Sequence, residues 1–341
     1  MKDVVESLNQ ALFRQGWTLG DRVYRIGHPF EWVDADRQTH FYAVEGVSAV
    51  LQYMSMFYEQ YPTPEEIATV DFDEMRQHCE QQLRDAYLHF APFRPVADME
   101  RYITSTALVR TQDYAFIKTY CKDLGDRPIK HLDIGPGLGS HALWSLKGFS
   151  SAYYALEASP HSWGVQRNFF RFLSSRSGSY LDLVEAERFG LSPDALHRAV
   201  NDEPGYRIKH VPSWMFEQVA PSSLDIVTAT WVLNEINFAG ILWLMSHAAR
   251  TLRRGGYVYI RDSGKLKPSR HAINYDQLLQ DIGFARRASL DVRNRVDYFG
   301  IPRVYEKTTD AVPGFDELVE RYIGRFAVVV HGGEYVQNVG A

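Results

Sequence analysis

The residues of this chain whose types and spacing could do chemistry lie between Lys130 and His141. Gly135, Gly137 and Gly139 alternate with other residues directly after an apolar run and directly before a helical pattern. Glycine allows a backbone to turn sharply and to approach a ligand closely, and the free N–H groups of a helix N-terminus favour carboxylate or phosphate groups. The stretch therefore predicts a ligand cradle between a strand and a helix.

Two acidic residues flank this cradle in the sequence. Asp133 stands two residues before the first glycine, and Glu157 closes a second strand-like run, eighteen residues past Gly139. An acid at the end of the second strand can accept hydrogen bonds from both ribose hydroxyls of a nucleoside. A dinucleotide motif has glycine at its sixth position, where this chain has Ser140, so a nicotinamide-dependent oxidoreductase is disfavoured.

The pattern of acid, G-x-G-x-G and second acid resembles the first two motifs of class I S-adenosylmethionine (SAM) methyltransferases. Two later segments are similar to that family: a strand-like run from Leu224 to Thr230 followed by Val-Leu-Asn-Glu, and Leu-Arg-Arg-Gly-Gly at 252–256 before another β run. The resemblance covers about residues 106 to 307. It implies a doubly wound α/β fold with a seven-stranded sheet closed by an antiparallel pair.

The alternation of β-like runs and helical patterns from Ile129 to Glu306 supports this α/β fold. We expect three regions: a helical N-terminal cap over 1–105, the SAM-binding domain over 106–307, and a short C-terminal extension over 308–341. By analogy with the fold, the cap would serve as a substrate lid or as the surface of a homodimer. The glycines at 255 and 256 are expected to end the helix before the fifth strand.

The resemblance also implies which residues hold SAM. The turn from Gly135 to Gly139 would pass under the methionine end, Arg110 would pair with the methionine carboxylate, and Glu157 would hold the ribose. A solvated helix face is the alternative interpretation of Arg110. Many relatives have an acid where this chain has Ser213 and Trp214. Adenine recognition would therefore depend on a hydrogen bond with Ser213 and on stacking against Trp214. The further cofactor contacts expected from family positions are Asp133, Pro136, Gly137, Ala158, Thr230 and Trp231.

Methyl transfer is an in-line displacement, and a hydroxyl acceptor usually needs a base to remove its proton. His271, after the fifth strand, is the candidate catalytic base, because histidine titrates near neutral pH. An ordinary surface histidine is the alternative, with Glu235, Asp262 and His161 as other candidate bases. Asn234 and Glu235 follow the fourth strand and are expected to orient the acceptor.

Composition and charge argue against several other classes of protein. The chain has 341 residues, of which 45% are hydrophobic and 23% charged, as in ordinary globular proteins. Its net charge of −5 gives no general attraction to nucleic acid or to an anionic membrane, and no apolar run approaches the length of a membrane span. Two cysteines build neither a disulfide framework nor a zinc cluster, and no Asp-Asp pair occurs that would suggest a metal site. We expect a cytoplasmic protein without a metal ion and without nucleic-acid or membrane partners.

These observations predict a SAM-dependent methyltransferase that acts on a small molecule. The expected acceptor is a hydroxyl of a sugar or of a natural product. The alternative is a catalytically silent, SAM-binding scaffold protein. That alternative would fit the missing adenine acid and the presence of Asn234 where several relatives have histidine.

Overall fold

The structure is a computed structural model that describes residues 48–58, 71–124, 129–158, 160–177, 179–188, 190–201, 205–236, 238–262, 274–289, 300–324, 328–331 and 334–337. The chain divides into two compact units. The glycine-turn unit comprises Thr39–Glu157 and His161–Val211, and the C-terminal unit comprises Met1–Gln38, Ala158–Pro160 and Pro212–Ala341. Each unit is described by itself below.

Helices and strands alternate along most of the described chain. The α-helices are α4 (Ser48–Tyr58), α5 (Asp73–Phe90), α6 (Glu100–Tyr120), α7 (His141–Trp144), α8 (Pro160–Ser177), α9 (Leu183–Arg188), α10 (Pro193–Asn201), α11 (Phe238–Thr251), α12 (Tyr275–Ile282) and α13 (Phe315–Val319). Short 3₁₀ or π segments are η2 (Val96–Met99), η3 (Lys122–Leu124), η4 (Ser145–Phe149), η5 (Ser213–Gln218), η6 (Leu233–Glu235) and η7 (Glu320–Gly324).

The strands are β1 (Ile129–Ile134), β2 (Ser150–Glu157), β3 (Ser179–Asp182), β4 (Tyr206–Pro212), β5 (Leu224–Thr230), β6 (Leu252–Asp262), β7 (Phe284–Ser289), β8 (Ile301–Lys307), β9 (Val328–His331) and β10 (Glu334–Gln337). Within the described residues, eight of them form one sheet in the order β3-β4-β2-β1-β5-β6-β8-β7, and β9 pairs with β10 separately. The predicted α/β class is confirmed. The sheet has one strand more than the seven predicted, because the short strand β3 pairs with β4 at the edge.

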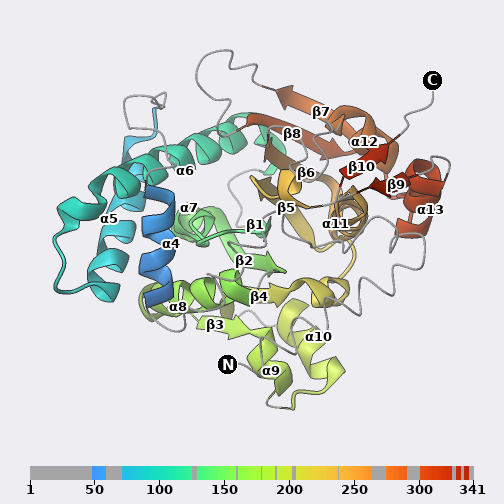
Figure 1. The fold of residues 1–341 in the computed structure, drawn as a ribbon. Helices are drawn as coiled ribbons and strands as arrows, with labels where there is room; N and C mark the ends of the chain where they lie inside the picture. Colours follow the sequence, from blue (N-terminus) through green and yellow to red (C-terminus); the bar gives the residue numbers. More distant parts are fainter. Residues whose placement is uncertain are drawn as a thin grey trace. The chain divides into compact units, whose positions relative to one another are not determined.

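In the glycine-turn unit, β1 pairs with β2 and β3 pairs with β4, each pair in parallel (Figure 1). Successive side chains of a strand point to opposite faces, and β2 shows the consequence. The ring of Tyr153 packs against that of Phe170 on α8, with centroids 6.1 Å apart. The hydroxyl of Tyr154 instead donates to the carbonyl of Val200 on α10 at 3.0 Å. Helices therefore cover both faces of this part of the sheet, as a doubly wound fold requires.

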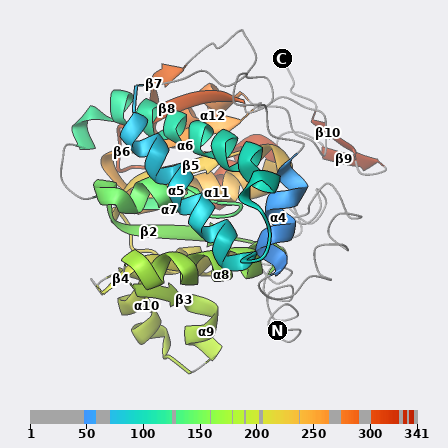
Figure 2. The ribbon, with the colours of Figure 1, turned by 90° about the vertical axis from the view of Figure 1, so that its left-hand side faces the viewer.

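Helices α4, α5 and α6 form a helical layer of the same unit, visible side by side in Figure 2. The apolar stripe of α5 is buried, as its helical spacing predicts. The members of that stripe are Met75, Cys79, Leu83, Tyr87 and Phe90. Burial of one continuous stripe fixes which face of α5 points inward.

In the C-terminal unit, β5 and β6 are parallel, and β8 is antiparallel to both β6 and β7. The predicted antiparallel closing pair is therefore confirmed. The prediction that Gly255 and Gly256 end a helix is wrong, because α11 ends at Thr251 and both glycines lie inside β6. Gly255 has φ +75°, and the register with β5 shifts there, so the glycines form an irregularity in the strand.

No helix among the described residues is long and apolar enough to cross a lipid bilayer. The division into a cap over 1–105, a domain over 106–307 and an extension over 308–341 stays a prediction.

Candidate cofactor-binding site

The glycine turn lies where the sequence predicts it, between β1 and α7. All three of its glycines have positive φ: +57° at Gly135, +62° at Gly137 and +89° at Gly139. The amide of Gly135 donates to the carbonyl of Leu156 at 2.9 Å, which ties the start of the turn to the end of β2. The turn and the end of the second strand are thus joined by the backbone itself.

Close packing also requires two of these glycines to lack a side chain. A Cβ added to Gly139 would collide with the ring of Phe170 on α8. A Cβ added to Gly137 would lie 2.5 Å from the hydroxyl oxygen of Tyr53 on α4. The glycines therefore let one helix pack against the turn and let a tyrosine hydroxyl of another approach it.

The predicted ribose acid, Glu157, is the last residue of β2 and is 4% exposed. The register of β1 and β2 pairs Ile134 with Leu156, so Glu157 follows the residue opposite the end of β1. Its Oε2 accepts a hydrogen bond from Nε2 of Gln166 at 2.6 Å. The same Nε2 donates to the carbonyl of Gly137 at 2.8 Å. One amide of α8 therefore connects the acid to the middle of the turn.

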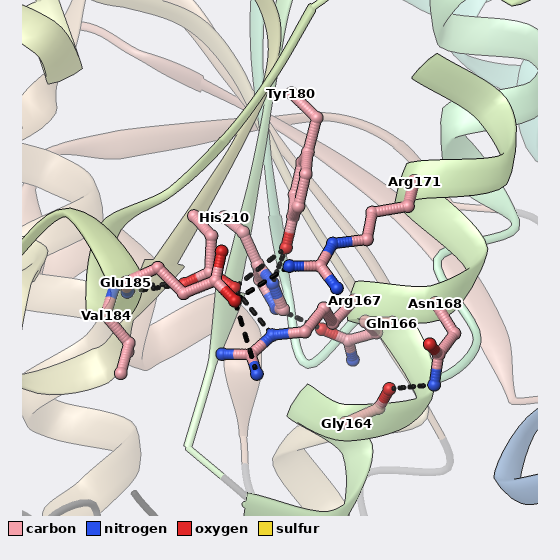
Figure 3. A network of polar contacts seen from close by, with 10 residues as sticks. Gly164, Gln166, Arg167, Asn168, Arg171, Tyr180, Val184, Glu185 and His210 are labelled. Atoms are coloured by element: carbon pink, nitrogen blue, oxygen red, sulfur yellow. Dashed lines mark hydrogen bonds and ion pairs between the residues drawn. The ribbon is translucent and has the colours of Figure 1, made fainter. Parts of the chain in front are cut away.

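Beyond Gln166, a polar network continues through the unit (Figure 3). Nε2 of His210 on β4 lies 2.8 Å from Gln166 Oε1, and Nδ1 of His210 lies 3.0 Å from the hydroxyl of Tyr180. The His210 ring stacks on the indole of Trp163, with centroids 3.4 Å apart and planes 8° apart. Burial lowers the pKa of His210 well below its ordinary value, and the nearby Arg167 lowers this pKa further, so the ring is neutral.

The outer end of this network is charged. Asp182, at the end of β3, accepts from Arg167 Nε at 2.8 Å, and the hydroxyl oxygen of Tyr180 lies 3.2 Å from the same carboxylate oxygen. Its other oxygen accepts from the backbone amides of Val184 and Glu185 at 3.0 and 3.1 Å, which begins helix α9. These bonds hold the edge strand and α8 together on the side of the network away from Glu157.

A second buried group of polar residues involves Asp133, on the strand that leads into the turn. His141 Nδ1 lies 3.0 Å from Asp133 Oδ2, and His141 Nε2 lies 3.0 Å from Asp113 Oδ2 on α6. Arg110 Nη1 donates to the same Asp113 oxygen at 3.0 Å, and the hydroxyl of Tyr153 donates to Asp133 at 2.8 Å. One imidazole therefore connects β1 to helix α6.

The charges around His141 determine its protonation. Burial by itself lowers the pKa of His141, and Arg110 acts in the same direction. The carboxylate of Asp133 and the hydrogen bonds to Asp113 and Asp133 outweigh both, so the pKa of His141 is raised above its ordinary value. His141 Nε2 and Arg110 Nη1 come within 2.9 Å of each other because both contact the same oxygen of Asp113.

His131, Asp133 and His141 are all buried, and their ligand atoms lie within 4.8 Å of one another, a spacing that could hold a metal ion. Protein partners already engage each of them. His131 Nδ1 lies 2.9 Å from Ser145 Oγ, and burial lowers the pKa of His131 to about 3. Each of the three residues therefore has at least one protein partner: Ser145 for His131, Tyr153 for Asp133 and Asp113 for His141.

No protein-family model and no curated protein matches this sequence. Among solved structures, the chain is similar to phosphoethanolamine N-methyltransferase 1 of Haemonchus contortus in complex with phosphoethanolamine and S-adenosylhomocysteine, at 12% identity and a TM-score of 0.40. That match covers 73% of this chain and 53% of the other, so the chain spans about half the length of that relative.

Two further similar structures are matched over most of their length. One is the 1,6-didemethyltoxoflavin-N1-methyltransferase of Burkholderia thailandensis, at 17% identity and a TM-score of 0.41, covering 71% of this chain and 95% of that one. The other is magnesium protoporphyrin IX methyltransferase from Synechocystis PCC 6803, at 14% identity and a TM-score of 0.41, covering 71% and 99%. Likeness this remote assigns neither an activity nor a substrate to the chain.

In the C-terminal unit, the predicted residues after β5 have an unusual backbone. Thr230 ends the strand, and Trp231 follows with φ +60°, a conformation that costs energy for a bulky side chain. The amide of Asn234 donates to Asp262 Oδ2 at 2.9 Å. The side-chain Oδ1 of Asn234 is buried and has no hydrogen-bond partner among the described residues. Strain of this kind clusters at functional sites.

The other predicted site residues differ in what the structure describes. Ser213 begins η5, and its hydroxyl is buried without a hydrogen-bond partner within the described part of the chain. Trp214 lies in the same segment, and Glu235 ends η6. Ala158 directly follows β2 and is partly exposed. The candidate base His271 lies outside the described residues, so its role stays a prediction.

Sequence reasoning missed several residues that the structure places at the turn or in the polar groups beside it: Tyr53, Asp113, His141, Gln166 and His210. A signal for Gln166 was available, since it shares one helical face with Trp163 and Phe170, which are three residues before it and four after it. A polar residue on an otherwise apolar, buried face needs a polar partner. Asp113, at helical spacing from the apolar residues Val109 and Ile117, gives the same kind of signal.

Proposed function

We propose that this protein is a SAM-dependent methyltransferase that transfers a methyl group to a hydroxyl of a small molecule. The observation that carries the proposal is the connection between the glycine turn and the acid of the second strand. Gln166 bonds both Gly137 and Glu157, and the Glu157 carboxylate is held in the unit that contains the turn. An acid held beside a glycine turn is the arrangement that a nucleoside with a charged tail requires.

The residues present fit SAM by the chemistry of their polar atoms. Glu157 offers carboxylate oxygens for the ribose hydroxyls, and the turn from Gly135 to Gly139 offers a backbone that a ligand can approach. Arg110 is proposed to pair with the methionine carboxylate while Asp113 holds its guanidinium. Ser213, whose hydroxyl lacks a partner within the described residues, is proposed to bond the adenine. When bound, the cofactor supplies an electrophilic methyl group on a sulfonium.

The acceptor is proposed to lie near the residues that follow β5. Asn234 supports this proposal, because its buried amide oxygen lacks a partner among the described residues and could accept the hydrogen of a substrate hydroxyl. Its backbone is fixed by the bond to Asp262. Glu235 is proposed to orient the same acceptor, and His271 is proposed to remove its proton. The acceptor class proposed from the sequence is a sugar or a natural product.

Isothermal titration calorimetry with SAM, S-adenosylhomocysteine and NAD⁺ tests the cofactor. We expect the first two to bind and Glu157→Ala to weaken their binding by about tenfold or more, because two hydrogen bonds to a carboxylate are lost. Glu74→Ala is the matched control, since Glu74 forms an exposed ion pair with Lys147, and surface pairs contribute little. Unchanged affinity in a folded Glu157→Ala variant, or binding of NAD⁺ alone, would contradict the proposal.

Methyl transfer itself requires a second measurement. Transfer of isotope-labelled methyl groups to a panel of hydroxylated sugars and aromatic compounds should yield a labelled product with at least one class. If SAM binds and no labelled product forms from any acceptor class, the chain acts as a SAM-binding scaffold instead of an enzyme.

A further inference from the structure

Gln166 occupies an unusual position for an uncharged side chain. It is 0% exposed, yet its Nε2 donates to two acceptors, the Gly137 carbonyl at 2.8 Å and Glu157 Oε2 at 2.6 Å. A primary amide has two N–H donors, so both are used. Any rotation of this amide would break a hydrogen bond to a buried carboxylate, which is costly in a buried site.

The orientation of the amide also determines the tautomer of the neighbouring histidine. Because the amide NH₂ of Gln166 must face two acceptors, its Oε1 must face His210 Nε2, 2.8 Å away. Nε2 must then carry the proton of His210 and donate it, which leaves Nδ1 to accept from the hydroxyl of Tyr180 at 3.0 Å. One arrangement of hydrogens satisfies every member of this chain of bonds. A flipped amide would place an N–H against the N–H of His210.

The histidine is itself held by two aromatic rings and by a hydroxyl partner, Tyr180, which Figure 3 shows beside it. Its ring stacks on Trp163, and Phe170 meets it edge-on with centroids 5.3 Å apart. Tyr180, its partner at Nδ1, also contacts Asp182, which Arg167 binds. The orientation of Gln166 is thus set by packed rings and by a chain of hydrogen bonds that ends in an ion pair.

We infer that Gln166, held by His210, is a positioning residue that fixes the Glu157 carboxylate beside the glycine turn and thereby sets how strongly the site requires an intact ribose diol. This inference rests on the proposed binding of SAM. Gln166 need not touch the ligand, because it acts through Glu157. Loss of Gln166 should reduce what the ribose hydroxyls contribute to binding affinity. What the rest of the ligand contributes to affinity should not change.

The test compares two ligands in each variant: S-adenosylhomocysteine and its 2′,3′-dideoxyribose analogue. In the unaltered protein we expect the diol to improve affinity by about 100-fold, since two hydroxyls bond a carboxylate. Gln166→Met keeps the shape of the side chain and removes both polar atoms. The preference for the diol should fall to about tenfold or less, while the affinity of the dideoxy analogue changes little.

A second variant keeps the inference testable if Gln166→Met fails to fold. Gln166→Glu is nearly identical in shape, but it places a carboxylate against Glu157 and against the Gly137 carbonyl, with neutral His210 as its remaining partner. Two carboxylates this close share a proton at lower pH. The diol preference of Gln166→Glu should therefore recover as the pH falls from about 8 to about 5. Gln77→Glu, on the exposed side of α5, adds the same charge and should show no such change.

The outcomes separate this inference from the proposed function. If the unaltered protein binds neither ligand, the proposed function fails. If it binds both, and Glu157→Ala abolishes the diol preference while Gln166→Met and Gln166→Glu retain it in full at every pH, then Gln166 merely fills space and the inference is overturned.

Discussion

His141 and His210 are both buried in the glycine-turn unit, and they have opposite electrostatic surroundings. His141 faces two carboxylates, Asp133 and Asp113, which raise its pKa despite burial. His210 faces a neutral amide, a tyrosine hydroxyl and a stacked indole, and its pKa is well below the ordinary value. The comparison shows that burial alone does not decide the charge of a histidine. Burial lowers the pKa of His210, whereas two carboxylates outweigh burial at His141.

The two environments also suit the two ends of the proposed ligand. The His141 cluster contains Arg110, the residue proposed to meet a carboxylate, and Asp113 shares its oxygen between these two cations. The His210 network ends at Glu157, the residue proposed to meet hydroxyls. The charged His141 cluster would position Arg110 for a charged group of the ligand. The uncharged hydrogen bonds of His210 and Gln166 would position Glu157 as a hydrogen-bond acceptor.

The largest expected effect is on stability when each ring is replaced by phenylalanine, which keeps the shape. His141→Phe leaves two buried carboxylates without their imidazolium, and removing one partner of a buried pair costs about 3–5 kcal/mol. His210→Phe keeps the ring stacked on Trp163 and leaves Gln166 Oε1 without its partner, while Tyr180 keeps its contact with Asp182, at a cost of about 1–3 kcal/mol. Urea unfolding at neutral pH measures both. Equal losses would show that His141 carries no charge in the folded protein.

These clusters also show where sequence reasoning succeeds and where it stops. The glycine turn and Glu157 could be predicted because a short local pattern encodes them. The α/β class could be predicted from the alternation of β runs and helices. The bond between Gln166 and His210 joins residues 44 positions apart, and no local pattern brings them together. Its prediction would require the packing of α8 on β4.

Two errors in the predicted fold have a similar origin. β3 has four residues, and its pairing with β4 makes it a strand, so its own sequence gave little signal. Gly255 and Gly256 follow a helix in the sequence, as a helix end requires, but they lie within β6. A Cβ at Gly256 would come within 3.0 Å of the Asp225 carbonyl, so tertiary packing against β5 explains that glycine. In both cases long-range contacts outweigh local preference.

The second prediction concerns the dependence of stability on pH. In the unfolded chain both histidines titrate near 6.5. The pKa of His141 is raised on folding. Its contribution to stability is therefore fully present below pH 6.5 and is lost as the pH rises through the pKa of the folded protein. The pKa of His210 is lowered on folding, so its contribution is present above pH 6.5 and is lost as the pH falls.

Unfolding free energies measured from pH 5 to 9 for the unaltered protein and both phenylalanine variants test these signs. The unfolding free energy of the unaltered protein should exceed that of His141→Phe by less and less above pH 6.5. Its excess over His210→Phe should shrink below pH 6.5. Each change should be at most about 1.4 kcal/mol per pH unit. The groups facing His141 are Asp133 and His131 on β1 with Asp113 and Arg110 on α6, and each is unchanged in both variants. If both free-energy differences shrank in the same direction of pH, the two histidines would not have opposite pKa shifts.

The smallest effect separates two tyrosines, one in each network. Tyr153 donates to the carboxylate of Asp133 at 2.8 Å, whereas the arrangement inferred for His210 makes Tyr180 donate to a neutral imidazole at 3.0 Å. Hydrogen bonds to charged groups contribute about 1.5–3 kcal/mol, and neutral ones about 0.5–1.5 kcal/mol. Tyr153→Phe should therefore destabilise the protein by about 1 kcal/mol more than Tyr180→Phe.

Each phenylalanine variant removes a single hydroxyl and keeps the ring, so urea unfolding isolates the bond. The outcome also tests the position of one proton. Tyr180 lies 3.2 Å from Asp182 as well, and if it donated there, its hydrogen bond would be to a charged group too. Equal losses for the two variants would then show that Tyr180 donates to Asp182. His210 Nδ1 would have to carry a proton, and Nε2 could donate to Gln166 only if the ring were charged. A smaller loss for Tyr180→Phe would agree with the neutral relay that holds Gln166 against Glu157.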